Sequence, residues 1–316
     1  MHSEELGDFI SALEAELGDS VSRDVMLGPY TTYGVGGPAA VLLAANSAED
    51  LLRAARIRAG TTVPVLTIGL GSNLLISDQG FEGLVVLMGS AFSEVVIEGT
   101  KVHAGAGAKL PVVARQSAAA GLTGFEWASG IPGTIGGAVR MNAGVHEADM
   151  STVLERVRVI DLATGDDGVM GPSSLELDYR HSSLGPSQVV VWAELSLQPG
   201  DPEVSRAAIK EKTQWRRDNQ PGGRNAGSVF ANPEGHSAGR LIDEVGLKGL
   251  RVGSAEVSPK HANFIVVDQN GSAQDVWQLM VEIRQRVFDT TSVVLQPENK
   301  LIALAPLPDP SGADNR

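Results

Sequence analysis

The hydrophobic positions in the first part of the chain switch between a helical and a strand-like period. Ser47 can cap a helix, and Asp50 stands three residues later, where its carboxylate can accept from the Ser47 N–H to complete a capping box. Short apolar runs at 41–44 and 63–68 predict strands before and after this helix. A second strand pair is predicted at 74–76 and 84–88. The N-terminus predicts an amphipathic helix that ends at Gly18, with its apolar positions at Leu6, Phe9, Ile10, Leu13 and Leu17. This β-α-β rhythm predicts a small α/β domain that ends near Gly89.

The middle of the chain predicts an α+β unit that ends near Gly200. A hairpin is expected at 95–97 and 101–104 around Gly99, followed by a helix over 110–120. Apolar runs at 157–162 and 189–197 predict two further strands.

The last third of the chain predicts another α+β unit, which a helix opens. Asp201 and Pro202 are a typical helix start, and this helix is expected to reach about Arg217. A helix over 238–245 closed by Gly246 and a strand over 262–267 follow, and two final strands are expected on either side of Pro297. A long helix between them has one apolar face, made of Val276, Leu279, Met280, Ile283 and Val287.

The predicted fold class is therefore α+β, with domain boundaries at 1–89, 90–200 and 201–305. The Pro- and Asp-rich segment 306–316 is expected to be a disordered tail.

Composition narrows the classes of function. The formal net charge of −13 lacks the basic field that nucleic-acid or membrane-surface binding needs. The absence of cysteine excludes disulfides, iron–sulfur clusters and thiolate catalysis. No apolar run approaches the length of a membrane span, and the acidic N-terminus has no secretory signal. The expectation is a soluble, cytoplasmic protein.

Glycine is frequent, with 37 of 316 residues, and two glycine-rich stretches are candidate ligand loops. Residues 124–144 hold six glycines between short apolar groups, which suits main chain laid against a large ligand. The Gly69-Leu70-Gly71-Ser72-Asn73 stretch follows a predicted strand and could cradle a pyrophosphate, although it is neither a dinucleotide fingerprint nor a Walker loop. For each stretch, a loop that merely turns is an equally good interpretation of the local pattern.

Three polar residues stand in short motifs that could carry chemistry. Arg180 offers a planar fork of donors for a carboxylate or enolate, Ser228 lies between small residues, and Glu298 follows a proline. The alternatives are a solvated arginine, a turn serine and an exposed glutamate. No nucleophile elbow surrounds Ser228, and the six histidines lack metal-ligand spacing, so neither a serine hydrolase nor a metal site is expected.

Taken together, these motifs resemble the UDP-N-acetylenolpyruvoylglucosamine reductase family over roughly residues 27–303. The ordered set is far more specific than any one member. It consists of residues 31–39, 69–78, 121–144, 179–182, 225–233, 246–249, 258–264 and 295–298.

The resemblance implies a fold in which residues 1–89 and 90–200 form a two-domain FAD-binding module of the vanillyl-alcohol-oxidase (PCMH) type. A C-terminal α+β domain, residues 201–305, would bind substrate. FAD would be held non-covalently, on its pyrophosphate and ring, by Gly69, Gly71, Ser72, Asn73, Leu74, Ser129, Gly130, Ile131, Pro132, Gly133, Thr134, Gly136, Gly137 and Ala138.

The resemblance also implies an activity, an NADPH-dependent reduction of UDP-N-acetylglucosamine enolpyruvate to UDP-N-acetylmuramate in peptidoglycan precursor synthesis. Flavin N5 would deliver hydride to the β-carbon of the enolpyruvyl group, Arg180 and Glu298 would stabilise the enol, and Ser228 would protonate the α-carbon. The protein would act as a monomer on this small molecule. Substrate contacts are expected from Tyr179, Arg224, Asn232, His261 and Asn263.

The chain departs from the family pattern at two positions near the anionic substrate. Ala231 and Asn219 stand where family members commonly have basic residues, and Arg216, Arg217 and Arg224 could compensate. Two alternatives remain at this point: an FAD-dependent sugar or alcohol oxidase of the same superfamily, and a non-catalytic relative that binds flavin or UDP-sugar.

Overall fold

The structure is a computed structural model that describes residues 2–145 and 148–312. The chain divides into two compact units, and each is made of segments that are distant in sequence. The first unit contains the residues up to Val25, Ala39–Leu70 and Glu82–Trp215. The second contains Met26–Pro38, Gly71–Phe81 and the residues from Arg216 onward. These units do not follow the three contiguous domains expected from sequence, whose boundaries stay a prediction.

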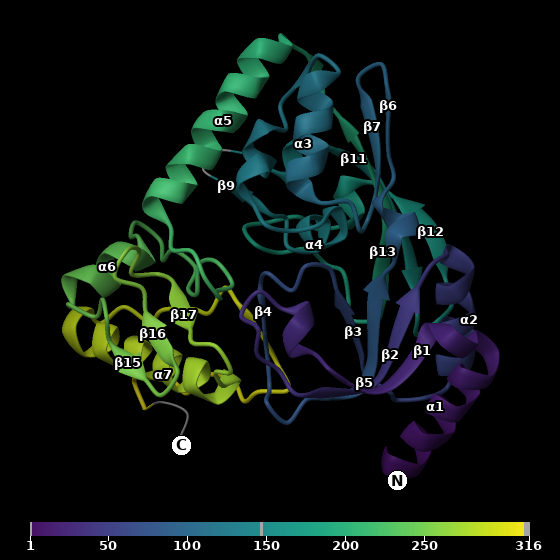
Figure 1. The fold of residues 1–316 in the computed structure, drawn as a ribbon, viewed down its shortest axis with the longest axis horizontal. Helices are drawn as coiled ribbons and strands as arrows, with labels where there is room; N and C mark the ends of the chain where they lie inside the picture. The colour runs from purple at the N-terminus through teal and green to yellow at the C-terminus, as the bar shows by residue number, and fades with distance from the viewer. Residues whose placement is uncertain (1, 146–147, 313–316) are drawn as a thin grey trace. The chain divides into compact units, whose positions relative to one another are not determined.

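One sheet of the first unit carries the predicted α/β pattern. Its order is β1 (Val21–Met26), β2 (Pro38–Ala45), β5 (Phe81–Met88) and β3 (Val65–Ile68), with β3 and β5 parallel. Helices α1 (His2–Leu17) and α2 (Ala48–Arg58) supply Leu13 and Leu51 to the core of this sheet (Figure 1). The predicted capping box is confirmed, since the Ser47 hydroxyl accepts from the Asp50 N–H and the Asp50 carboxylate accepts from the Ser47 N–H.

A five-stranded antiparallel sheet forms the other half of the first unit. Its order is β12 (Asp167–Met170), β11 (Leu154–Asp161), β13 (Gln188–Ser196), β7 (Lys101–Gly105) and β6 (Val95–Glu98). The β6–β7 hairpin around Gly99 is confirmed. Helices α3 (Leu110–Ala119) and α4 (Ile135–Arg140) share one core with this sheet (Figure 1).

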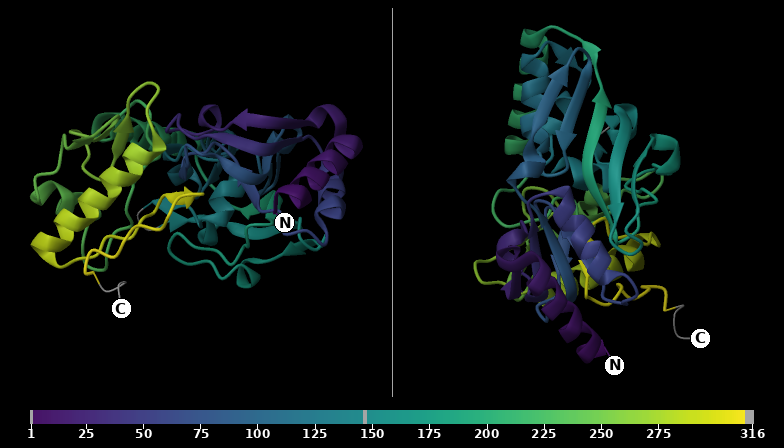
Figure 2. Two further views of the ribbon diagram at one scale, coloured as in Figure 1. Left: turned by 90° about the horizontal axis from the view of Figure 1, so that it is seen from below. Right: turned by 90° about the vertical axis from the view of Figure 1, so that its right-hand side faces the viewer.

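The second unit is built on a long helix and a small antiparallel sheet. Helix α7 (Ala273–Thr291) packs against β15 (Arg251–Val252) and β16 (Ala255–Val257), and β17 (Ile265–Val267) completes the sheet (Figure 1). In Figure 2, α7 is the long yellow-green helix. Its predicted apolar face is confirmed, since all five of its residues are buried. Helix α6 (Ala238–Glu244) belongs to the same core, and α5 (Pro202–Asn219) crosses from the first unit into the second.

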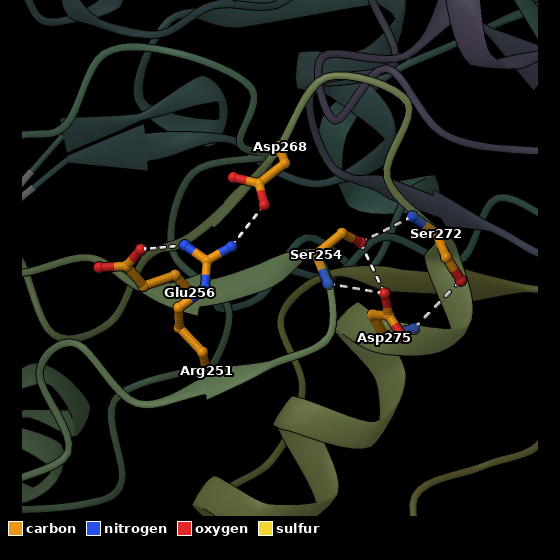
Figure 3. A network of polar contacts seen from close by, with 6 residues as sticks. All are labelled: Arg251, Ser254, Glu256, Asp268, Ser272 and Asp275. Atoms are coloured by element: carbon orange, nitrogen blue, oxygen red, sulfur yellow. Dashed lines mark hydrogen bonds and ion pairs between the residues drawn. The ribbon is translucent and has the colours of Figure 1, made fainter.

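Polar contacts fix the start of α7 against the sheet (Figure 3). The Asp275 carboxylate accepts from the N–H and the hydroxyl of Ser254, at 2.8 and 2.7 Å, and these bonds lower the pKa of Asp275. Ser272 caps the helix by accepting from the Asp275 N–H. Arg251 joins Glu256 and Asp268 beside this turn.

Three expectations from the sequence differ from the structure. Strand β4 (Leu74–Ile76) does not pair with β5; it pairs in parallel with β18 (Lys300–Ile302), because a turn at Ser77–Gly80 ends the local run and a distant strand supplies the partner. The two strands expected on either side of Pro297 reduce to one. Residues 292–299 form no strand, Pro297 itself makes an isolated bridge with Phe230, and β18 follows.

The third difference concerns the C-terminal segment, of which 306–312 are described. Arg284 donates to the carbonyls of Leu307 and Pro308, and the Leu307 side chain is buried in the core of the second unit. These residues are therefore held against α7 where the sequence predicted a disordered tail, because a buried guanidinium needs acceptors. Residues 313–316 lie outside the described residues.

Candidate functional site

The glycine-rich stretch of the first unit is held by a carboxylate at its beginning. Glu126 opens the short 3-10 turn Glu126–Gly130 and accepts from the Gly124 N–H at 2.8 Å and from the hydroxyls of Thr123 and Ser205. Burial opposes the charged form, but these hydrogen bonds outweigh it and lower the pKa of Glu126. The stretch is thus anchored by an ionised carboxylate.

Helix α4 follows directly, and Thr134 is its N-cap, with the hydroxyl accepting from the Gly137 N–H at 3.4 Å. A Cβ on Gly69 would lie 2.5 Å from the Thr134 hydroxyl, so this glycine lets the end of β3 reach the cap. Among the described residues, the backbone N–H groups of Gly133 and Thr134 donate to no protein acceptor. Donors of this kind beside a helix start suit an anion.

The second predicted loop, residues 71–74, lies in the second unit. Gly71 has φ 60°, and a Cβ there would lie 2.2 Å from the Tyr30 carbonyl oxygen, so only glycine fits. In the described part of the chain, the N–H groups of Gly71, Ser72 and Asn73 have no protein acceptor. The β4–β18 pairing holds the loop from its far end, and the Lys300 N–H donates to the Asn73 carbonyl at 2.9 Å.

Arg180 belongs to a tight turn of the first unit. It has φ 55° and donates to the Gly144 carbonyl at 2.8 Å, and its guanidinium lies 4.9 Å from the centre of the Tyr179 ring. Asn142, after α4, holds this turn by donating to the Asp178 carbonyl at 3.1 Å. The sequence did not single out Asn142; its only local signal is an asparagine in a glycine-rich motif, which is typical of turns.

Ser228 and Glu298 are brought close together in the second unit. The Glu298 N–H donates to the Val229 carbonyl at 2.8 Å, and Phe230 bridges to Pro297 in the next register position. The Ser228 hydroxyl is half-buried and, among the described residues, makes no hydrogen bond. The backbone segments that carry Ser228 and Glu298 are thus neighbours, although the two residues are 70 positions apart in sequence.

A second residue missed in the sequence is Asn299, which is 2% exposed. Its amide donates to the Asn73 side chain and to the carbonyls of Ala226 and Ser228, at 3.0, 3.0 and 3.1 Å. The Tyr33 hydroxyl donates to its Oδ1 at 3.1 Å. No local pattern marks Asn299, because its partners lie in distant segments.

The residues expected to contact substrate have varied surroundings. Tyr179 is 53% exposed. The Arg224 side chain lies along the backbone of Gly34, where a Cβ would be 3.0 Å from Arg224 Cδ. The Asn232 side chain accepts from the Ala238 N–H at 3.0 Å. The His261 ring packs edge-on against Phe264, and burial lowers the pKa of His261, which favours its neutral form.

Asn263 supports the serine loop. It is 4% exposed, and its side chain accepts from the Phe230 N–H at 3.0 Å and donates to the Phe230 carbonyl at 2.8 Å. A buried amide satisfies its polar atoms within the protein, and the expected substrate contact of Asn263 stays a prediction.

One possible replacement for the basic side chains, Arg216, has a side-chain partner of its own. Arg216 donates to the Gln220 side chain at 2.6 Å, and burial lowers the pKa of Arg216. The Arg217 carbonyl accepts from the Lys260 ammonium at 2.5 Å. Ala231, whose N–H donates to the Gln296 carbonyl at 2.9 Å, keeps the backbone role of its position without a charge.

Taken separately, each of the two glycine-containing loops suits a phosphate group of a nucleotide cofactor. Within the described residues, each presents N–H groups without a protein acceptor, which can bind phosphate oxygens without a basic side chain. Within 2–145 and 148–312, no group of three or more His, Asp or Glu side chains could hold a metal ion. None of the helices in those ranges is long and apolar enough to cross a membrane.

Comparison with known proteins agrees with this fit. Residues 38–166 match the model of an FAD binding domain, and residues 219–302 match that of the UDP-N-acetylenolpyruvoylglucosamine reductase C-terminal domain. A glucose oxidase variant of Phl p 4 has a TM-score of 0.50 at 16% identity, covers 71% of this chain and 52% of its own, and shares the fold alone. The chain is therefore an FAD-binding oxidoreductase with the predicted α+β, vanillyl-alcohol-oxidase (PCMH)-type fold.

Relatives at higher identity define the family. UDP-N-acetylenolpyruvoylglucosamine reductases of Paramagnetospirillum magneticum and Rubrobacter xylanophilus are 39% and 41% identical, over 90% and 88% of this chain and 92% and 94% of their own. The crystal structure of the Thermus caldophilus reductase has a TM-score of 0.77 at 40% identity, over 89% of this chain and 98% of that one. The chain belongs to the UDP-N-acetylenolpyruvoylglucosamine reductase family.

Proposed function

We propose that this protein reduces UDP-N-acetylglucosamine enolpyruvate to UDP-N-acetylmuramate with NADPH, a step of peptidoglycan precursor synthesis in the cytoplasm, and that it acts as a monomer. The observation that carries the proposal is the adjacent placement of Ser228 and Glu298 on hydrogen-bonded segments, in a chain of this family. This placement supports a shared role for the two residues, because reduction of a carbon–carbon double bond needs a proton donor as well as a hydride donor.

As the family resemblance implies, residues 69–74 and residues 129–138 would each contribute contacts to FAD, on its pyrophosphate and its flavin ring. When bound, FAD supplies a two-electron carrier that accepts hydride from NADPH and passes it to the β-carbon of the enolpyruvyl group.

Arg180 and Glu298 would act on the charge that develops at the α-carbon and its carboxylate. The guanidinium offers two parallel donors to that carboxylate, and Glu298 supports the enol form. Ser228 would transfer its hydroxyl proton to the α-carbon and regain one from solvent. One hydride and one proton are added, so that NADPH, one proton and the enolpyruvyl ether give NADP⁺ and the lactyl ether.

An anaerobic titration of the purified holoenzyme tests the reaction. NADPH should bleach the flavin band, and UDP-N-acetylglucosamine enolpyruvate should restore it promptly. A flavin that stays reduced would contradict the proposal. Rapid turnover with oxygen and a sugar, without NADPH, would indicate an oxidase, and failure to bleach would indicate a non-catalytic relative. Light scattering of the same sample checks the monomer.

Replacement of the proposed acid separates its role from binding. Ser228→Ala should slow restoration of the flavin band by about 10²- to 10⁴-fold, because general acid catalysis contributes that much, and should leave bleaching by NADPH unchanged. Ser173→Ala, at an exposed serine, is the matched control. If the flavin band of Ser228→Ala returned at close to the wild-type rate, Ser228 would not be the proton donor.

A further inference from the structure

The Asn299 amide is the point where three segments of the second unit meet. Its two N–H groups face three acceptors, on Asn73 of the cofactor loop and on Ala226 and Ser228 of the serine loop. Neither N–H can be turned toward solvent, since the residue is 2% exposed. Removal of these donors would leave buried carbonyls unsatisfied, at a cost beyond that of an ordinary hydrogen bond.

Tyr33 determines which way this amide faces. Its ring is fully buried, and burial raises the pKa of Tyr33 far above its ordinary value, so the hydroxyl remains a donor. It donates to Oδ1 of Asn299, and this leaves the NH₂ group directed at the serine loop. Tyr33 and Asn299 thus form a pair 266 positions apart.

The bonds from Asn299 reach the backbone of the proposed proton donor, Ser228, and of Ala226 two positions before it. Ala226 and Ser228 lie on either side of Gly227, whose φ of 73° makes the loop a sharp turn. Asn73 also donates to the carbonyl of Glu298, at 3.2 Å, so the same two asparagines hold both proposed catalytic segments.

We infer that Asn299, oriented by Tyr33, is a positioning residue that holds Ser228 and Glu298 for proton transfer to the substrate; this inference rests on the proposed function. Asn299 does not touch the reacting atoms in this assignment. It acts through the serine loop, and its loss should affect the step that uses Ser228 and spare flavin reduction.

The test compares the two half-reactions in the holoenzyme. The flavin is reduced either by NADPH or photochemically, and the photoreduced enzyme is mixed with UDP-N-acetylglucosamine enolpyruvate. Asn299→Asp keeps the size of the side chain and the acceptor for Tyr33 but loses the N–H donors. It should slow reoxidation by substrate about 100-fold, as misplacement of a reacting group does, and leave flavin reduction within about twofold.

Two further variants keep the inference testable if a buried carboxylate prevents folding. Tyr33→Phe removes only the hydroxyl that orients the amide, and should slow reoxidation about tenfold. Asn270→Asp, an exposed asparagine of the same unit, should change neither half-reaction. In a Ser228→Ala background, neither Tyr33→Phe nor Asn299→Asp should slow reoxidation further, because both act through Ser228.

Equal slowing of both half-reactions, or additive effects with Ser228→Ala, would show that Asn299 has a merely structural role. Either result would overturn this inference and leave the proposed function standing. Normal reoxidation in Tyr33→Phe and Asn299→Asp would do the same. If substrate fails to reoxidise the wild-type enzyme, the proposed function falls and this inference falls with it.

Discussion

Arg180 has an unusual backbone conformation, and a hydrogen bond holds its guanidinium. Its neighbour Tyr179 is exposed. A non-glycine residue with φ 55° is uncommon, and such conformations persist where surrounding contacts over-determine them. Here the Gly144 carbonyl holds the guanidinium from one side and the Tyr179 ring lies near it. The turn therefore presents an arginine in one defined geometry, as a carboxylate-binding role requires.

Arg180→Lys should retain the positive charge and lose the planar fork. We expect kcat for the proposed reduction to fall on the order of 10²-fold, as on removal of a donor to developing charge, while flavin binding stays unchanged. Steady-state kinetics with flavin absorbance checks this. Arg206→Lys, on the exposed face of α5, is the control and should behave as wild type. Unaltered kcat in Arg180→Lys would remove Arg180 from the mechanism.

At the scale of single elements, the beginnings of helices show how closely local sequence fixes structure. The capping box of α2 was predicted from two residues, because both partners lie within one turn. The β4–β18 pairing could not be predicted in this way, because its two strands lie far apart in the sequence and each looks like an ordinary short apolar run.

Ser47→Ala should destabilise α2 by about 1 kcal/mol, since the cap satisfies an otherwise unpaired N–H of the first turn. The midpoint of urea unfolding should fall, with no effect on the flavin spectrum. Ser174→Ala, an exposed serine outside any cap, is the matched control. Equal midpoints for Ser47→Ala and wild type would show that the box contributes nothing.

The start of α7 should give the protein a dependence on acid pH. The pKa of Asp275 is lowered by the backbone and side-chain hydrogen bonds from Ser254, so its contribution to stability is present above the ordinary value of 3.8 and is lost as pH falls through the lower, folded value. Asp275→Asn should thus be destabilised at neutral pH, and the difference from wild type should shrink in acid.

Urea unfolding at several pH values, followed by tryptophan fluorescence, measures this difference. Asp8→Asn, on the exposed side of α1, provides a carboxylate control. A gap between Asp275→Asn and wild type that widened on acidification would contradict the assignment.

For the whole molecule, binding of FAD should raise the stability of the folded protein. A ligand that binds only the folded state stabilises it, by about 2.7 kcal/mol when its free concentration is 100 times Kd. Protein stripped of flavin should therefore melt at a lower temperature, and FAD should restore the Tm. FMN lacks the diphosphate and should restore it less. Equal rescue by FMN and FAD would argue against diphosphate binding at the two loops.

Most of the site was accessible from sequence only through the ordered set of motifs. Alone, Ser228 or Glu298 is an ordinary turn residue, and the structure adds that their segments are hydrogen-bonded neighbours. The structure also gives a reason for two of the glycines that differs from the one suggested by sequence, which was close approach of a ligand. Gly69 and Gly71 are required by close approach of other protein atoms, which no composition argument distinguishes from close approach of a ligand.

The sequence by itself determined the α-helices other than α4, the capping box, the hairpin and the buried face of α7, because these depend on residues within one or two turns of each other. Tertiary structure alone decided helix α4 within the glycine-rich stretch, the units built from separated segments, the partner of β4 and the burial of Asn263. It also decided the meeting of Tyr33, Asn73 and Asn299, residues up to 266 positions apart. Such contacts depend on which distant segments the tertiary fold brings together, and the local pattern of hydrophobic residues carries no information about that.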